Sequence, residues 1–377
     1  MPPSNSVRLF LCGDVMTGRG VDQIMAHPSD PALYEDAVAS ALDYVRFAEA
    51  VNGAIARRAP PSYVWGAALD ELKRRRPDLR VINLETSVTR SDAHVPKGIN
   101  YRMSPQNADC LTAAAIDCCV LANNHVLDWG RAGLLETLDT LERLNVKTAG
   151  AGRDATEALR PAILASSGGP RVLVFSFAST TSGVPREWAA REGAPGVALL
   201  PDLSERGAAW AAERVLSFKR PGDVVVASIH WGDNWGYHVP DEQRRFARAL
   251  IDAAGVSIVH GHSSHHAKAI EVHHGRLVLY GCGDFLNDYE GIEGYEQFRG
   301  DLALMYFADV DAASGDLGAL EMTPLRIRRL QLQRASRADV AWLAKTLDPE
   351  CARFGARVTT MREGTLALSW RSAPRYE

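Results

Sequence analysis

The chain has 377 residues, of which 46% are hydrophobic and 23% are charged, and it contains 8 Trp, 10 Tyr and 10 Phe. This composition excludes a disordered, collagen-like or coiled-coil protein, and the length suits one large domain or two ordinary ones. Because 42 Lys and Arg are set against 46 Asp and Glu, the formal net charge is only -4. That balance excludes the broad basic field of proteins that bind nucleic acid or anionic membranes.

The amino-terminal sequence MPPSNSVRLFLCGDV has its first basic residue at Arg8, followed by a short apolar stretch. This stretch is too short for a signal peptide, and no other segment approaches the roughly 18 apolar residues of a membrane span. We therefore expect a cytoplasmic protein without a membrane partner. The six cysteines include no CxxC pair, and three lie in apolar runs, so we expect reduced, buried thiols.

Short β-rich runs recur along the chain, each ending in a loop with Gly, Asn or His. They cover residues 7–12, 80–84, 117–122, 171–178, 224–229, 256–259 and 277–280. Apolar residues at helical spacing follow at 132–144 and 241–254, residues 27–63 read as a helical insertion, and 180–202 as a long loop at the site. Strands that alternate with helices predict an α/β layer fold, and their nearly continuous apolar character suits sheets covered on both faces.

The pattern changes after Asp301, where two further β-rich runs read as a hairpin and residues 339–351 read as a helix. We expect this carboxyl-terminal segment, 301–377, to complete the second sheet. The sequence therefore predicts one domain over residues 1–377, with its core at 7–290.

Polar residues stand where the predicted strands end, the position at which open α/β sheets place their sites. They are Asp14 in GDVMTGRG, Glu85 in NLETS, Asn124 and His125 in ANNHVLDWG, His230 in IHWGDNWGY, and His260, His262, His265 and His266 in IVHGHSSHH. Any one of them has an ordinary alternative role as a turn residue, an N-cap or a core histidine. Five strands that each deliver a metal-ligand type to one sheet edge together predict a metal site.

These blocks, together with YGCGDF, resemble the CapA family of capsule and poly-γ-glutamate biosynthesis proteins over residues 7–288. That family is related in fold to the calcineurin-like metallophosphoesterases. The resemblance implies a four-layer α/β/β/α sandwich with a metal site between the two sheet edges. It also implies one or two divalent metal ions, with Mn, Zn, Fe and Ca all open.

The resemblance assigns roles to individual residues. Asp14 matches the first metal carboxylate, Glu85 takes the place of a bridging aspartate, and Asn124 matches the asparagine ligand. His125 matches the histidine near the reaction centre, and Asp128 is placed to orient it.

His230 matches the next histidine block, whereas G-H-S-S-H stands where relatives have G-x-H-P-H. This difference leaves open which of His260, His262 and His265 bind metal; we take His260 and His262 as ligands. Asp14, His125 and His265 are the acid and base candidates. A further difference is Met16, which replaces a histidine ligand, so one metal position can be weak or empty. Many relatives also have an amino-terminal membrane anchor, which we do not expect here.

Three functional classes stay open at this point. A phosphoesterase needs two well-held metals and cationic groups for phosphoryl oxygens, for which Arg19 and Arg102 are candidates, with ordinary ion pairing as their alternative role. Metal-assisted proton transfer at the α-carbon of a peptide substrate, as in peptide-tailoring epimerases of the family, needs fewer ligands, and we favour it. A binding module with a degraded site is the third class. Trp235, in a Gly-broken polar stretch, suits the rim of a substrate cleft.

Overall fold

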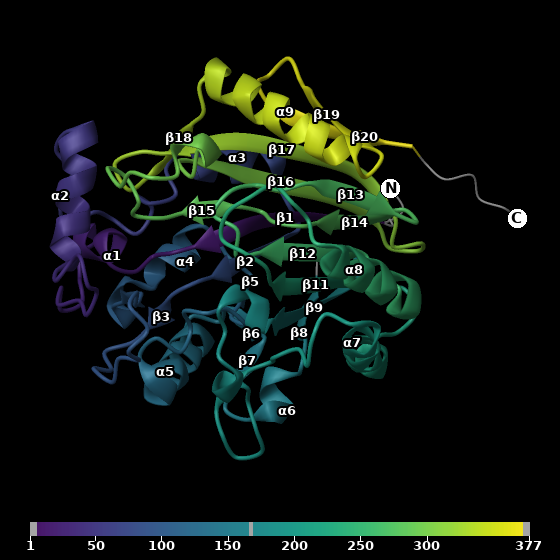
Figure 1. Ribbon diagram of the computed structural model, residues 1–377, viewed down its shortest axis with the longest axis horizontal. Coiled ribbons are helices and arrows are strands. Elements are labelled where there is room, and N and C mark those ends of the chain that lie inside the picture. The colour runs from purple at the N-terminus through teal and green to yellow at the C-terminus, as the bar shows by residue number, and fades with distance from the viewer. Residues whose placement is uncertain (1–5, 166–168, 372–377) are drawn as a thin grey trace, which may run out of the picture.

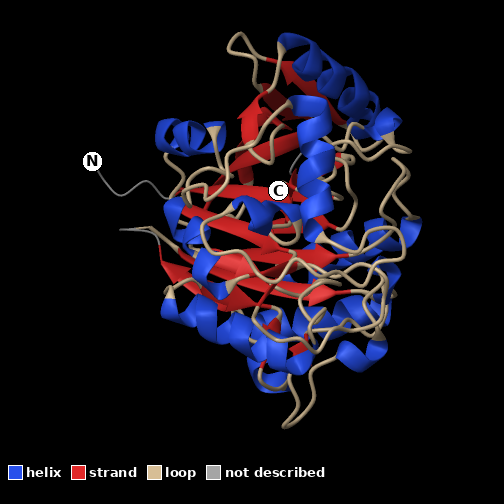
Figure 2. Cartoon of the chain, turned by 90° about the vertical axis from the view of Figure 1, so that its left-hand side faces the viewer, coloured by secondary structure: helices blue, strands red, loops and turns tan. Residues whose placement is uncertain are grey.

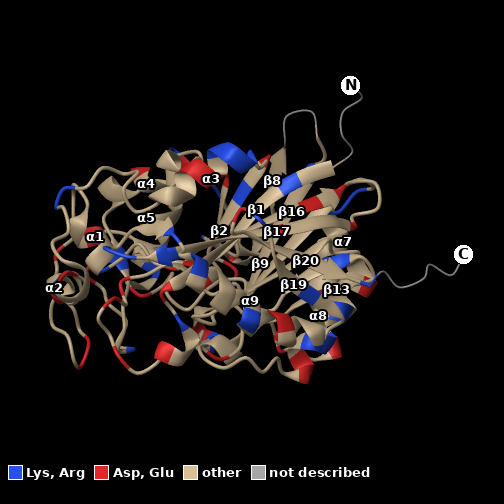
Figure 3. Ribbon diagram, turned by 90° about the horizontal axis from the view of Figure 1, so that it is seen from above, with Lys and Arg blue, Asp and Glu red and all other residues tan. Residues whose placement is uncertain are grey.

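A computed structural model of the chain describes residues 6–165 and 169–371, and over these residues two β-sheets lie face to face with helices outside them (Figure 1). Figure 2 shows the strands gathered in the interior with helices around them. The predicted four-layer α/β/β/α sandwich is therefore confirmed. Figure 3 shows Lys and Arg interspersed with Asp and Glu in this view.

The first sheet is built around the amino-terminal strand β1. In spatial order its strands are β19 (Ala356–Thr360), β20 (Leu366–Trp370), β17 (Leu317–Ile327), β16 (Leu302–Asp311), β1 (Ser6–Val15), β2 (Leu79–Leu84), β5 (Cys118–Val120) and β6 (Lys147–Ala149), with β15 (Asp284–Leu286) beside β1 and β18 (Leu332–Arg334) beside β17. β1, β2, β5, β6 and β15 are parallel neighbours, so their carboxyl ends lie at one edge of the sheet.

The second sheet lies under the first. Its order is β13 (Ile270–His273), β14 (Arg276–Leu279), β12 (Ile258–His262), β11 (Val224–His230), β9 (Arg171–Ala178) and β8 (Ala162–Ala165). β9, β11, β12 and β14 are parallel. Two small pairs flank the sheets: β3 (Ser87–Val88) with β4 (Arg102–Met103), and β7 (Ala151–Gly152) with β10 (Gly196–Val197).

Helices cover the outer faces of the two sheets, except that α2 stands at the side of the sandwich against α1 (Figure 1). The α-helices are α1 (Gly20–Ile24), α2 (Ala41–Asn52), α3 (Ala67–Arg75), α4 (Asp109–Ala113), α5 (Gly130–Arg143), α6 (Ala155–Ala158), α7 (Glu205–Phe218), α8 (Asp241–Ala254) and α9 (Arg337–Ala352). Short 3-10 turns are η1 (Pro105–Asn107), η2 (Thr180–Ser182), η3 (Arg186–Trp188) and η4 (Glu296–Phe298). Among the described helices, none is long and apolar enough to cross a membrane.

Alternation along the strands divides the apolar core into layers. Leu9 and Leu11 of β1 face the second sheet, whereas Phe10 and Cys12 face the helices on the other side of the first sheet. Residues of β9 and β11 alternate in the same way between the inter-sheet layer and the layer under α7 and α8. A strand with both faces buried reads as a continuous apolar run, which is the pattern of the sequence.

The carboxyl-terminal segment differs from the prediction. Its hairpin, β16 with β17, pairs antiparallel with β1 and so extends the first sheet, not the second. Arg8 of β1 and Asp309 of β16 are register partners whose side chains form an ion pair of 2.6 Å. β16 therefore occupies one edge of β1 in the sheet. The local sequence pattern does not predict this pairing, because the two strands are far apart in the chain. Whether residues 1–377 form one domain stays a prediction.

Candidate metal centre

The carboxyl ends of β1, β2, β11 and β12 bring polar side chains from both sheets together. Asp14 is the next-to-last residue of β1, Asn83 is the next-to-last residue of β2, and Glu85 directly follows β2. His230 ends β11 and His262 ends β12, directly opposite each other in register. All five side chains are buried, at 0–2% exposure. The strand-end residues that the sequence singled out thus meet between the two sheet edges.

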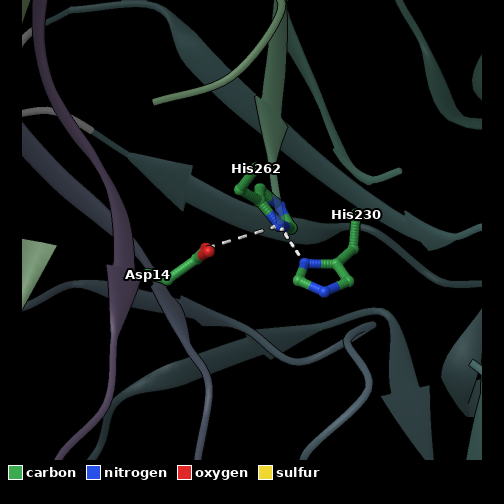
Figure 4. A group of neighbouring side chains, drawn as sticks. All are labelled: Asp14, His230 and His262. Carbon is green, nitrogen blue, oxygen red and sulfur yellow. Dashed lines mark hydrogen bonds and ion pairs between the residues drawn. The ribbon is translucent and has the colours of Figure 1, made fainter. Parts of the chain in front are cut away.

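Asp14, His230 and His262 form the centre of this cluster (Figure 4). The Nδ1 atoms of His230 and His262 are 2.7 Å apart, and Nδ1 of His262 lies 3.9 Å from Oδ1 of Asp14. The backbone N–H of Ser263 donates to the other oxygen of Asp14 at 3.2 Å. Ser263 has a φ of 103°, a strained conformation for a non-glycine residue, which turns the chain at this point.

Glu85 and Asn124 border the cluster on the side of the first sheet. Oε1 of Glu85 lies 3.9 Å from Nε2 of His230, and Oδ1 of Asn124 lies 3.0 Å from the same nitrogen. Asn83 donates to both carboxylates, to Asp14 at 2.7 Å and to Glu85 at 3.1 Å. Asn83 therefore fixes the spacing of the two acids.

The donor set fits a divalent cation. Burial, and then the neighbouring Asp284, raise the pKa of Asp14 to about 7, and burial and Asp14 raise the pKa of Glu85 well above its usual range. Burial lowers the pKa of His230 and His262 well below the ordinary value, so both rings are the neutral imidazoles that metals require. Buried carboxylates that repel each other and converging neutral imidazoles are both relieved by a bound cation.

His125 lies at the edge of this cluster with an acidic and a basic partner. Its Nδ1 is 2.7 Å from Oδ2 of Asp128, and its Nε2 is 3.8 Å from Oε1 of Glu85. Burial lowers the pKa of His125 to about 4. Lys97, which the sequence analysis did not single out, places its Nζ 2.7 Å from Oδ1 of Asp128 and 3.3 Å from Nδ1 of His125.

A second imidazole–carboxylate pair lies on the side of β15. Nδ1 of His265 is 2.9 Å from Oδ1 of Asp284, and Asp284 is the register partner of Asp14 across β1 and β15. Burial lowers the pKa of His265, but the adjacent Asp284 carboxylate outweighs it, so the pKa is raised overall. Asp284 belongs to the YGCGDF segment, but the sequence predicts no role for it. Only the pairing of β1 with β15 places it beside Asp14.

His260 is engaged elsewhere, although it was predicted to be a ligand. Its Nε2 lies 2.8 Å from the Cys12 carbonyl of β1, and its Nδ1 lies 3.0 Å from the Ser228 hydroxyl. The Nε2 contact links the two sheets, whereas the Nδ1 contact joins β12 to the neighbouring β11 within the second sheet, so both ring nitrogens already have protein partners. We leave His260 out of the ligand set that we carry forward.

The two predicted arginine clamps are committed to internal partners. Arg19 is buried, pairs through Nε and Nη2 with both oxygens of Asp288, and donates to Glu35 and Tyr44. Arg102 donates to the carbonyls of Ser91 and Asp30 and to the Asp92 carboxylate, and its guanidinium lies 3.9 Å above the Trp129 ring. Both guanidinium groups therefore have protein partners, and a role for either in substrate binding stays a prediction.

Met16 and the predicted rim residue complete the site. Met16 is buried, and the hydroxyl of Tyr289 donates to its sulfur at 3.6 Å.

Trp235, the predicted rim residue, is half-buried; its ring stacks on the Tyr295 ring with centroids 4.1 Å apart and lies 5.1 Å from the ring of His265. Tyr295 is 50% exposed, so this pair forms an aromatic surface next to the His265–Asp284 pair.

An α/β sandwich whose two sheets meet at a carboxylate–imidazole cluster defines a candidate metalloprotein. The chain belongs to the family described as bacterial capsule synthesis protein PGA_cap, which it matches over residues 8–289. It is 46% identical over 364 residues to a probable polyglutamine synthesis accessory protein of Mycobacterium tuberculosis, covering 96% of each chain.

Two more distant relatives are named CapA. The PGA biosynthesis protein CapA of Bacillus subtilis is 28% identical over 247 residues, which is 65% of this chain and 60% of that protein. The capsule biosynthesis protein CapA of Bacillus anthracis is 25% identical over 232 residues, which is 62% of this chain and 53% of that protein. The resemblance to the CapA family drawn from the motifs is therefore confirmed.

Proposed function

We propose that this chain is a metal-dependent enzyme of a biosynthetic pathway that acts on a peptide-like polymer of glutamate or glutamine by exchanging a proton at an α-carbon. The substrate class follows from the names of the relatives, which connect them to polyglutamine, PGA and capsule synthesis. The proposed ligands are Asp14, Glu85, Asn124, His230 and His262. A divalent cation bound there would act as a Lewis acid on a carboxylate or carbonyl oxygen of the substrate.

The observation that carries this proposal is the presence of two imidazole–carboxylate pairs at the cluster, one beside Glu85 and the other beside Asp14. His125 turns its Nδ1 to Asp128 at 2.7 Å, and His265 turns its Nδ1 to Asp284 at 2.9 Å. Each ring keeps its Nε2 for a proton at the substrate. Inversion of a carbon centre needs one group that removes a proton and another that returns it from the opposite side, and two oriented histidines suit that task.

The charge around His125 also supports an acidic or amide-rich substrate. Nζ of Lys97 lies beside His125, and the Lys97 side chain is 22% exposed. This ammonium is paired with Asp128 and donates to the Asn124 carbonyl, so it would attract a substrate carboxylate toward His125 by its charge and partial exposure and not as an unpaired group.

A metal-dependent hydrolase or phosphoesterase is the second candidate. The position of Glu85, 3.8 Å from His125 and 3.9 Å from His230, suits a bridging ligand of the kind that two-metal hydrolases use. Met16 at a ligand position and the internal pairing of Arg19 and Arg102 favour the first candidate.

The deciding experiment uses the metal-loaded enzyme and a glutamate oligomer in D₂O. Proton exchange would add one mass unit at a single Cα while the oligomer stays intact, whereas hydrolysis would release shorter fragments. Robust turnover of bis-p-nitrophenyl phosphate, without deuterium in any peptide tested, would overturn the proposal in favour of the phosphoesterase.

A further inference from the structure

A second group of potential metal ligands lies on the surface, at the opposite end of the second sheet. Asp252 belongs to the last turn of α8, and His273 and His274 belong to the hairpin between β13 and β14. α8 ends at Ala254, just before β12 begins, whereas His262 ends β12. The length of a strand therefore separates this group from the candidate metal centre.

The three side chains converge on one point. Nε2 of His273 lies 3.0 and 3.1 Å from the two oxygens of Asp252, and Nδ1 of His274 lies 2.9 Å from Oδ1. Ligand atoms that bind one tetrahedral zinc ion at about 2.0–2.1 Å are roughly 3.3 Å from one another. The nitrogen–oxygen separations need to widen by only a few tenths of an ångström to admit such an ion, and all three ligand atoms lie within 4.8 Å of one another.

The hairpin turn holds the two histidines together at the expense of local strain. His273 pairs with Arg276, so His274 and Gly275 form a two-residue loop, with φ values of 49° and 81°. A loop of this type prefers Asn-Gly, because both central residues have positive φ. Histidine in the place of asparagine brings adjacent rings, which alternate on a regular strand, into a stack with centroids 4.0 Å apart.

Asp252 is also placed where a cation is favoured. A carboxylate in the last turn of a helix faces the negative end of the helix dipole, which is unfavourable unless positive charge lies beside it. The neighbouring cations are committed to other acids: Arg248 donates to Glu271 at 2.9 Å, and Arg276 lies 3.6 Å from Asp316. Arg248 also interacts electrostatically with Asp252, but less strongly than with Glu271.

We propose that Asp252, His273 and His274 form a surface site for a borderline divalent cation such as Zn²⁺, Ni²⁺ or Cu²⁺, separate from the candidate metal centre. Two imidazole nitrogens and one carboxylate are a donor set that these ions prefer over Mg²⁺ or Ca²⁺. The side chains of Asp252 and His274 are 48% and 67% exposed, so water can fill the remaining position. A bound ion would tie α8 to the β13–β14 hairpin.

The test counts zinc ions per chain by equilibrium dialysis and elemental analysis of the full-length protein after EDTA treatment. His274→Asn removes a ligand while it supplies the residue that the turn prefers, and Asp252→Asn keeps the shape of the carboxylate. We expect each variant to bind one zinc ion fewer than the unchanged protein, or to bind it at least tenfold more weakly. His27→Ala, which removes another exposed histidine, is the matched control and should bind zinc unchanged.

Zinc at the candidate metal centre is separated by repeating the count in His262→Ala. We expect His274→Asn to lower the count by one in that background as well. An unchanged zinc count in His274→Asn and Asp252→Asn, in either background, would overturn the proposal. So would displacement of the surface ion by an equal concentration of Mg²⁺.

Discussion

At the scale of single residues, His262 occupies the most constrained position of the cluster. Its Nδ1 lies between His230 and Asp14, and its Nε2 is 2.8 Å from the Ser228 hydroxyl. His262→Ala would leave the cluster without a central donor. We expect lower metal content and, because metal binding to the folded state stabilises it, a lower melting temperature that no longer responds to EDTA.

Elemental analysis and thermal unfolding with and without EDTA measure both effects. His260→Gln is the control for destabilisation alone, because His260 is buried and bonded to Cys12 and Ser228. It should lower the melting temperature while the metal content stays. Full metal occupancy in His262→Ala would contradict the proposed ligand set.

His125 has a different expected role from His262. Because Nδ1 of His125 is turned to Asp128, we expect it to move a proton rather than to hold the metal. His125→Ala should retain the metal and lose turnover by about 10²- to 10⁴-fold, the usual contribution of a general acid or base. Metal analysis beside the D₂O exchange assay checks both parts, and loss of metal in this variant would make His125 a ligand instead.

The sequence predicted which polar residues stand at the strand ends, but it did not predict which side chains they contact in the folded protein. Arg19 looked available because its partner, Asp288, is 269 residues away in the chain. Lys97 lies in an irregular segment between β3 and β4, where no periodicity points to a direction. Asp284 gains its position only from parallel pairing with Asp14. Chemistry carried by a local motif was therefore predictable, and chemistry made by long-range pairing was not.

At the scale of elements, the predicted strands and helices were confirmed where apolar periodicity was strong. The run at 171–178 and the helix at 241–254 coincide with β9 and α8. The hairpin of β16 and β17 was predicted but assigned to the wrong sheet. Both sheets present buried apolar faces, so an amphipathic hairpin fits either one locally, and only the pairing with β1 decides between them.

The contact of β1 with β15 depends on a glycine. A Cβ atom added at Gly13 would stand 1.7 Å from the carbonyl oxygen of Gly283, which is backbone and cannot rotate away. We expect Gly13→Ala to force the strands apart and to destabilise the fold by at least about 1–3 kcal/mol, the usual cost of overpacking. Because Asp14 follows Gly13, metal content should fall as well.

Denaturant unfolding midpoints and metal analysis measure the two consequences of Gly13→Ala. Gly318→Ala in β17 is the matched control, since its added Cβ would lie 3.5 Å from the nearest atom, an ordinary contact. Equal unfolding midpoints for the two variants would contradict the prediction, because they would show that β1 and β15 can move apart without loss of stability.

At the scale of the whole molecule, the six cysteines report on the integrity of the core. All of them are buried and free of disulfides, as predicted. Burial raises the pKa of each thiol, for example that of Cys110 to about 12. Since the thiolate is the reactive form, we expect almost no reaction with a thiol reagent such as DTNB in the native state.

Unfolding in guanidinium chloride should release all six thiols to DTNB. Cys12, Cys282 and Cys119 lie behind the candidate metal centre, in the cores on either face of β1. Rapid reaction of even one thiol in the folded protein would contradict the packed interior described above. A count below six after unfolding under non-reducing conditions would contradict the absence of disulfides.

The position of β1 in the middle of the first sheet has a consequence for synthesis on the ribosome. Arg8 and its partner Asp309 are 301 residues apart in sequence. At about 5–20 residues per second, roughly 15–60 s pass between the emergence of β1 and that of β16. During this interval one edge of a long apolar strand has no native neighbour, which is the condition under which nascent chains aggregate or recruit chaperones.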